Sequence, residues 1–220
     1  MVERAEVYKG VLPVGLGADA LGGAVNVITR KTANYLDVSY SFGSFNTHKA
    51  SINGAYTNGK TGLTTRLTSF LNYSDNNYKV YVPIIDLESG QKLGNQWVKR
   101  FHDGYKSLRV RLETGFVNRP FADYLLAGII VAGNDKDIQN GVVMELVYGA
   151  RTTDSRSVIP MLRYKKSDLF IEGWGLSFYG SYSDVDNNST DTVPRRYNWQ
   201  GEWVPNASTS SGERSRSQLH

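Results

Sequence analysis

The sequence has no cysteine and only three histidines among its 220 residues. Without cysteine the chain can form no disulfide, no thiolate metal site and no cysteine nucleophile. The histidines, His48, His102 and His220, lack the spacing typical of a zinc site. We therefore expect no metal site and no cysteine-based catalysis.

Long apolar runs are also missing. No stretch reaches the roughly 18 apolar residues of a membrane-spanning helix, and the longest apolar run lies within 124–132. The first ten residues, MVERAEVYKG, contain none of the three parts of a secretory signal peptide. This excludes a helical membrane protein, and it indicates either a cytoplasmic chain or one that begins inside a longer protein.

Blocks of like charge are absent as well. The 25 Lys and Arg residues and 21 Asp and Glu residues give a net charge of +4, and they are interspersed along the chain. Nucleic-acid-binding surfaces usually show clustered basic residues. We therefore expect no nucleic acid among the partners.

What the sequence does have is tyrosine, tryptophan, glycine and a repeated two-residue period. In 34–43, Leu36 and Val38 share one face of an expected strand, and Asp37 and Ser39 share the other. Similar strands are expected within 49–57, 63–73, 107–116, 173–182 and 197–203, and a strand that is apolar on both faces is expected within 123–133. Together they predict about eight strands of about ten residues, the length of a tilted strand that crosses a membrane.

The expected connections differ in length. Long loops are predicted at 75–104, 134–157 and 184–195, and short turns at 118–122 and 166–168. Short turns at one end and long loops at the other are typical of outer-membrane barrels, although the tight turn at 43–46 departs from this rule. A soluble antiparallel sandwich also has alternating strands and is the competing interpretation.

Aromatic residues tend to lie near the ends of these strands, on the apolar face. Such rings favour the interface between membrane and water. The aromatic positions are Tyr40, Phe42, Tyr56, Tyr73, Phe116, Trp174, Tyr182, Tyr197 and Trp203. They favour the membrane barrel over the sandwich.

The segment 15–20 fits the G-x-G-x-x-A spacing of a dinucleotide-binding turn. Such a turn must be followed by a helix, whose amino end holds the phosphate. Gly22 and Gly23 arrive too soon for a helix and lead into a β-branched run. The context therefore argues against a nucleotide site.

The segment 2–31, VERAEVYKGVLPVGLGADALGGAVNVITRK, resembles the last part of the plug domain of TonB-dependent outer-membrane receptors. In that family a strand of the type I-E-R-I-E-V-x-K-G is followed by a small-residue turn and by G-G-x-I-N-I-x-T-K, after which the barrel begins. Residues 2–10 match the first element and 22–30 the second. Leu16 and Pro13 depart from the common pattern, which leaves the subfamily open.

The resemblance implies an all-β fold with two parts. Residues 1–32 would be the C-terminal piece of a plug domain, and 33–220 would be a partial transmembrane antiparallel β-barrel. The expected strands, about eight, would belong to a larger barrel of about 22 strands, the class that holds a plug.

The resemblance also implies a function, that of an importer that is not an enzyme and has no catalytic residue and no cofactor. The chain would belong to the bacterial outer membrane and take part in TonB-dependent active uptake of a scarce ligand: siderophore-bound iron, a vitamin or a glycan. The implied partners are the TonB complex, bound through a missing N-terminal part, a small-molecule, metal-chelate or oligosaccharide ligand, outer-membrane lipid, and a surface lipoprotein. The alternatives are a passive or adhesive barrel and a soluble β-rich binding module, each without energised transport.

Three groups of residues are candidates for these roles. The plug motif comprises Glu3, Arg4, Glu6, Gly10, Gly17, Gly22, Gly23 and Asn26. The candidate contacts inside the barrel are Arg66, Arg109, Arg111 and Glu113, and those in the loops are Tyr78, Tyr81, Trp97 and His102. The alternative for the strand charges, and the one that we favour, is that they only solvate the interior or form ion pairs between strands.

Overall fold

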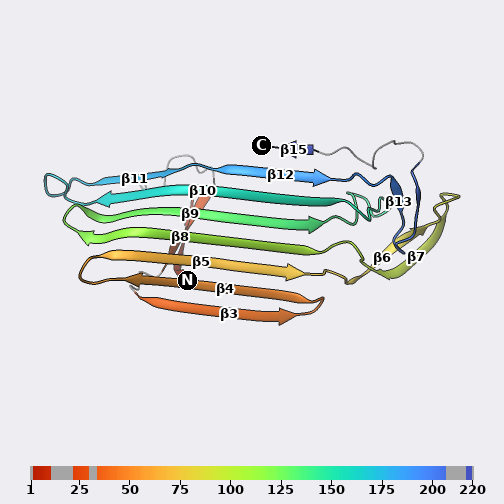
Figure 1. The fold of residues 1–220 in the computed structure, drawn as a ribbon, viewed down its shortest axis with the longest axis horizontal. Coiled ribbons are helices and arrows are strands. Elements are labelled where there is room, and N and C mark those ends of the chain that lie inside the picture. The colour runs from red at the N-terminus through yellow and green to blue at the C-terminus, as the bar shows by residue number, and fades with distance from the viewer. Residues whose placement is uncertain (1, 11–21, 30–33, 207–216, 220) are drawn as a thin grey trace.

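The computed structural model describes residues 2–10, 22–29, 34–206 and 217–219, and these form strands, turns and loops without a helix (Figure 1). Every strand pair in this part of the chain is antiparallel. The prediction of an all-β antiparallel fold is confirmed.

One large sheet dominates the structure. Its strands are β3 (Tyr35–Gly43), β4 (Thr47–Thr57), β5 (Leu63–Ser74), β8 (Tyr105–Arg119), β9 (Ala122–Asp137), β10 (Thr152–Lys166), β11 (Leu176–Ser181), β12 (Asp184–Thr190) and β15 (Ser217–Leu219). They lie in the order β15-β12-β10-β9-β8-β5-β4-β3, and β11 pairs with the last part of β10, end to end with β12. The sheet is open, with β3 at one edge and β15 at the other.

Smaller hairpins lie beyond one end of this sheet (Figure 1). The chain between β5 and β8 contains β6 (Lys79–Ile85) paired with β7 (Lys92–Lys99). Further on, β13 (Arg195–Tyr197) pairs with β14 (Trp203–Pro205). The long connections after β5, β9 and β12 all leave the sheet at this end, which we call the loop end.

The opposite end, which we call the turn end, carries the connections at 58–62, 120–121 and 167–175. The tight turn between β3 and β4 lies at the loop end, and Phe45 and Asn46 adopt positive φ there. The predicted alternation of shorter and longer connections is therefore confirmed in outline.

Several predicted boundaries are wrong. The expected loop at 184–195 begins with strand β12, and the expected loop at 134–157 shrinks to 138–151 because β9 and β10 extend into it. The expected turn at 166–168 is the longer connection 167–175. The missed parts of β9, β10 and β12 carry polar residues on both faces, so they lack the alternation from which strands are predicted.

The segment 197–203 is also not a strand of the large sheet. It forms the turn between β13 and β14, and Asn198 Oδ1 accepts hydrogen bonds there from the backbone N–H groups of Gln200 and Glu202, at 3.0 and 3.1 Å. Its aromatic residues pack among the loops instead of along a strand. The segment 197–203 thus shows the two-residue period of a strand, although its residues belong to a small hairpin and its turn.

The cross-strand register gives the large sheet an apolar face. Val38 lies opposite Ile52, and Leu67 opposite Leu112, which in turn lies opposite Ile129. These side chains are not covered: Val38, for example, is 68% exposed. A soluble sheet normally buries such a face against a second layer.

The other face, the polar face, is more crowded. Leu126, Ile130 and Met161 are buried there, and so is the charged Glu113. Side chains crowd on the concave side of a curved sheet and spread on the convex side. The burial therefore indicates that the sheet curves toward its polar face.

The N-terminal strands form a hairpin of their own. β1 (Val2–Lys9) pairs with β2 (Gly23–Thr29), and neither belongs to the large sheet. The predicted β-branched strand after Gly22 is thus confirmed. The G-x-G-x-x-A run at 15–20 and Gly17 lie outside the described residues.

Candidate functional site

The polar face carries most of the excess positive charge of the protein. Its basic side chains are Lys49, Arg66, Arg109, Arg111, Arg119, Lys136, Arg163 and Lys165, and its acidic ones are Asp37 and Glu113. On the apolar face the acidic residues Asp123, Asp135, Asp137, Asp154, Asp184 and Asp186 outnumber the basic residues Lys106, Arg156 and Lys166. Charges that are interspersed in the sequence are therefore separated by the fold.

Glu113 is the centre of the basic group. It is only 5% exposed, and its Oε1 accepts from Arg111 Nη2 at 2.9 Å and lies 3.4 Å from Arg163 Nη1. Arg66 occupies the position opposite Glu113 on β5. The structure thus brings three of the predicted interior residues together and adds Arg163, which the sequence gave no reason to single out.

A glycine on β9 makes room for this carboxylate. Gly128 lies opposite Glu113 on one side and Met161 on the other. A Cβ atom at Gly128 would come within 2.7 Å of Glu113 Cγ and 2.9 Å of the Leu112 carbonyl oxygen. Only glycine therefore lets the Glu113 side chain lie across β9 toward Arg163.

Glu113→Gln is expected to destabilise the sheet by about 2 to 3 kcal/mol, because two arginines lose their counter-charge in a crowded place. The loss stays below that of a fully buried pair, since both arginine side chains are about a third exposed. Denaturant unfolding followed by strand circular dichroism measures it. Asp135→Asn is the control, because the Lys106–Asp135 pair is exposed; equal losses would contradict the prediction.

At the loop end the hairpins share a small apolar core. Val82, Ile84, Val147 and Trp199 are buried together, and Trp199 Nε1 donates to the Met144 carbonyl oxygen at 2.6 Å. Three separate loop segments therefore pack into one unit. The predicted loop at 75–104 contains a hairpin that the sequence analysis did not expect, and the apolar residues of this β6–β7 hairpin have a partner far along the chain.

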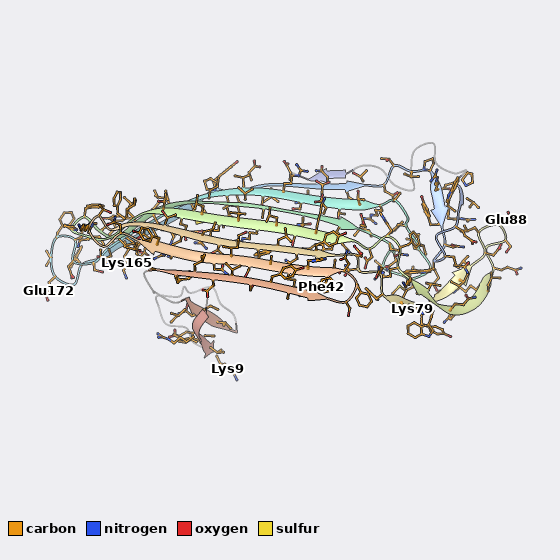
Figure 2. The ribbon with its side chains drawn as sticks, turned by 60° about the horizontal axis from the view of Figure 1, so that its bottom comes forward. Lys9, Phe42, Lys79, Glu88, Lys165 and Glu172 are labelled. Carbon is orange, nitrogen blue, oxygen red and sulfur yellow. The ribbon has the colours of Figure 1, made fainter. Side chains whose placement is uncertain are left out.

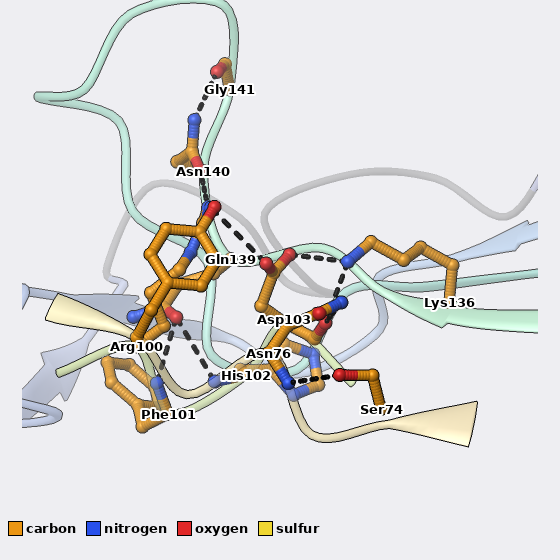
Figure 3. Close-up of polar contacts among 11 residues, drawn as sticks. Ser74, Asn76, Arg100, Phe101, His102, Asp103, Lys136, Gln139, Asn140 and Gly141 are labelled. Carbon is orange, nitrogen blue, oxygen red and sulfur yellow. Dashed lines mark hydrogen bonds and ion pairs between the residues drawn. The ribbon is translucent and has the colours of Figure 1, made fainter. Parts of the chain in front are cut away.

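Polar contacts join this loop unit to the sheet (Figure 3). Arg100 lies 3.2 Å from the Asp103 carboxylate and donates to Tyr78 Oη at 2.6 Å and to Asn140 Oδ1. Lys136 Nζ, from the end of β9, lies 2.5 Å from Asp103 Oδ1. Tyr78, a candidate ligand contact, is thereby engaged within the protein.

His102 is held in the same way. Its Nε2 lies 2.8 Å from the Arg151 carbonyl oxygen, and its backbone N–H donates to Gln139 Oε1 at 3.2 Å. Gln139 Oε1 also accepts from the backbone N–H of Phe101 at 2.9 Å. The structure gives His102 a role in fixing the loops, and its predicted contact with ligand stays untested.

Tyr81 and Trp97 form an exposed aromatic pair. They lie opposite each other in the β6–β7 hairpin, their ring centroids are 5.5 Å apart, and they are 56% and 66% exposed. They point away from the apolar core, since Val82 and Ile84 fill the other face of the hairpin. Of the four loop candidates, these two are free to meet a ligand.

A cleft of about 270 Å³ opens beside the same hairpin, lined by Pro83, Ile85, Glu145 and Trp199 among others. A hydrogen bond from Lys92 lowers the pKa of Glu145. In the hairpin turn, hydrogen bonds from the Ser89 side chain and backbone lower the pKa of Asp86. Both lowered pKa values favour the ionised carboxylates, and Glu145 places its charge in the lining of the cleft.

The plug motif shows internal pairing. Glu6 accepts from Arg4 Nε at 2.8 Å and from Asn26 Nδ2 at 3.0 Å, and the Arg4 hydrogen bond is the main cause of the lowered pKa of Glu6. Gly23 has φ 136°, and a Cβ there would lie 2.3 Å from the Tyr8 carbonyl oxygen. Gly10 also has positive φ, Gly22 precedes β2, and Glu3 lies in β1.

The part of the chain that the structure describes has no group of three or more His, Asp or Glu side chains that could hold a metal ion. In these same residues, no helix is long and apolar enough to cross a membrane. Compared with known proteins, the chain matches no protein-family model, no curated protein and no solved structure.

Proposed function

We propose that the chain forms part of the wall of a bacterial outer-membrane barrel, a TonB-dependent receptor that takes up a scarce ligand. One observation carries the proposal: the large sheet leaves the apolar side chains of one face uncovered and places most of its basic side chains on the other face. Lipid accepts an apolar outer face, whereas the water-filled or plugged interior of a barrel accepts a polar one.

The size of the apolar face supports this proposal. Along β8 the apolar side chains run from Leu108 to Phe116, about 27 Å at about 3.4 Å per residue. A strand tilted by about 40° then covers about 20 Å of depth, which approaches the ~25 Å band of outer-membrane barrels. Tyr40 and Tyr73 lie toward the loop end of this band, and Phe116 and Tyr164 toward the turn end.

In this proposal the loop end faces the outside of the cell. The exposed Tyr81–Trp97 pair and the cleft beside it would meet the ligand first, and the basic polar face would line the way inward. Energy transfer through TonB is supported by the resemblance of 2–31 alone. The β1–β2 hairpin would then be part of the plug.

A cysteine at Glu88 should react with an impermeant thiol reagent on intact cells of the native host, and a cysteine at Glu172 should not. The two residues lie at opposite ends of the molecule (Figure 2). The absence of natural cysteine gives a clean background. Labelling is read by mass after purification, and permeabilised cells provide the control in which both sites react.

Equal labelling of both sites on intact cells would contradict a wall that crosses the outer membrane. Labelling of neither site would favour a soluble β-rich module inside the cell. A barrel without energised transport would give the expected labelling pattern, but ligand uptake would then continue in cells that lack TonB.

A further inference from the structure

A small hollow lies on the polar face toward the loop end, next to Arg109. Its volume is about 220 Å³, and its lining includes Arg109, Ser107, Asn134, Ser155 and Ser157. The register explains the gathering, because Ser107, Asn134 and Ser155 lie side by side on β8, β9 and β10. Arg109, Ala132 and Ser157 form the adjacent row, where the small Ala132 leaves the space.

Arg109 has a free cationic group. Its side chain is exposed, and no hydrogen bond or ion pair ties its guanidinium to any residue that the structure describes. Nearby on the same strand, Arg111 Nε is buried without a hydrogen-bond partner. The basic face therefore offers donors that its own carboxylates do not use.

The described residues of the N-terminal hairpin bring no net negative charge. They include Glu3 and Glu6, but Arg4 and Lys9 balance them. Among the described residues, Glu113 is already paired with Arg111 and Arg163, and Asp103 is paired with Lys136. Neither carboxylate neutralises Arg109, whose charge is thus left for a molecule from outside the described part of the chain.

We propose that the hollow beside Arg109 binds an anionic group, a carboxylate or a phosphate, of the ligand that passes along this face. The guanidinium of Arg109 would make charge-assisted hydrogen bonds to the anion, while the serine hydroxyls and the Asn134 amide donate to its remaining oxygens. That the bound anion belongs to an imported ligand rests on the proposed function.

The test is calorimetric titration of the protein, purified from its host in mild detergent, with citrate and with inorganic pyrophosphate at fixed ionic strength. Sorbitol serves as the neutral probe. We expect one of the two anions to bind and sorbitol not to bind. Arg109→Gln should weaken that binding at least tenfold, and Ser155→Ala about two- to fivefold.

Lys165→Gln is the matched control. Lys165 is also an exposed cation on the polar face, but it lies eight residues along β10 from Ser157, about 27 Å away at about 3.4 Å per residue. Its loss should change the affinity by less than twofold. Strand circular dichroism verifies that each variant is folded.

Absence of anion binding by the unmodified protein would overturn the inference, as would unchanged affinity in Arg109→Gln or an equal loss in Lys165→Gln. The thiol-labelling experiment separates this result from the proposed function. If the anion binds at this site but the labelling shows no membrane topology, the anion site stands and the receptor proposal is wrong. If the labelling shows the expected topology but no anion binds, the receptor proposal stands and the anion site is wrong.

Discussion

Val110→Arg is expected to prevent assembly of the protein in the outer membrane. Val110 lies in the middle of the apolar face, opposite Ser69 on β5 and Val131 on β9. In a barrel wall this position faces the hydrocarbon core, where an arginine costs about 2 to 4 kcal/mol. That is a large fraction of the 5 to 15 kcal/mol that typically holds a folded domain together.

The neighbouring position provides the control. Arg109 lies one residue earlier on β8 and points to the polar face, so Arg109→Ser should assemble normally. Assembly is measured as the amount of protein in outer-membrane fractions and its mobility with and without heating. If both variants assemble equally well, both faces of the sheet are wet and the membrane proposal is wrong.

The two faces of the sheet could be predicted because a strand has a strict period of two. Wherever Leu, Val or Tyr alternated with Ser, Thr or Arg, the sequence indicated both the strand and the side on which each residue lies. The predicted segment 123–133, which lies within β9, lacked this contrast, and its length and its apolar character identified it instead.

The strand ends beyond the apolar band were missed for the same reason. Both faces of β12 carry polar residues, such as Asp184 and Asp186 on one face and Asn187 on the other, so no period of two is visible. Backbone pairing with β10 holds this strand in place. Such pairing depends on residues about 30 positions away and leaves no local signal.

The anion hollow could not be predicted either. Ser107, Asn134 and Ser155 are ordinary polar residues in the sequence, and only the register of three strands brings them beside Arg109. The charge separation is similar, because a net charge of +4 for the chain conceals a strongly basic polar face. The sequence identified Arg66, Arg109, Arg111 and Glu113 as charged strand residues, but it did not show how they are arranged relative to one another.

Trp199→Ala is expected to unfold the loop unit while leaving the large sheet intact. Trp199 is 2% exposed and packs against Val82, Ile84 and Val147, which come from two other segments. Truncation of a buried tryptophan to alanine typically costs about 3 to 5 kcal/mol, through lost apolar contact and the remaining cavity. The hydrogen bond to the Met144 carbonyl oxygen is lost as well.

Hydrogen exchange measures this local stability. Amides of β6 and β7 should lose most of their protection in Trp199→Ala, whereas those of β8 and β9 should keep theirs, because the apolar core of the loop unit does not extend into the sheet. Trp97→Ala makes the same truncation at an exposed position of the same hairpin, and its cost should stay near 1 kcal/mol, the value of its contact with Tyr81. Equal exchange in the two variants would mean that the loops are held by the polar contacts around Arg100 and Asp103 and not by their apolar core.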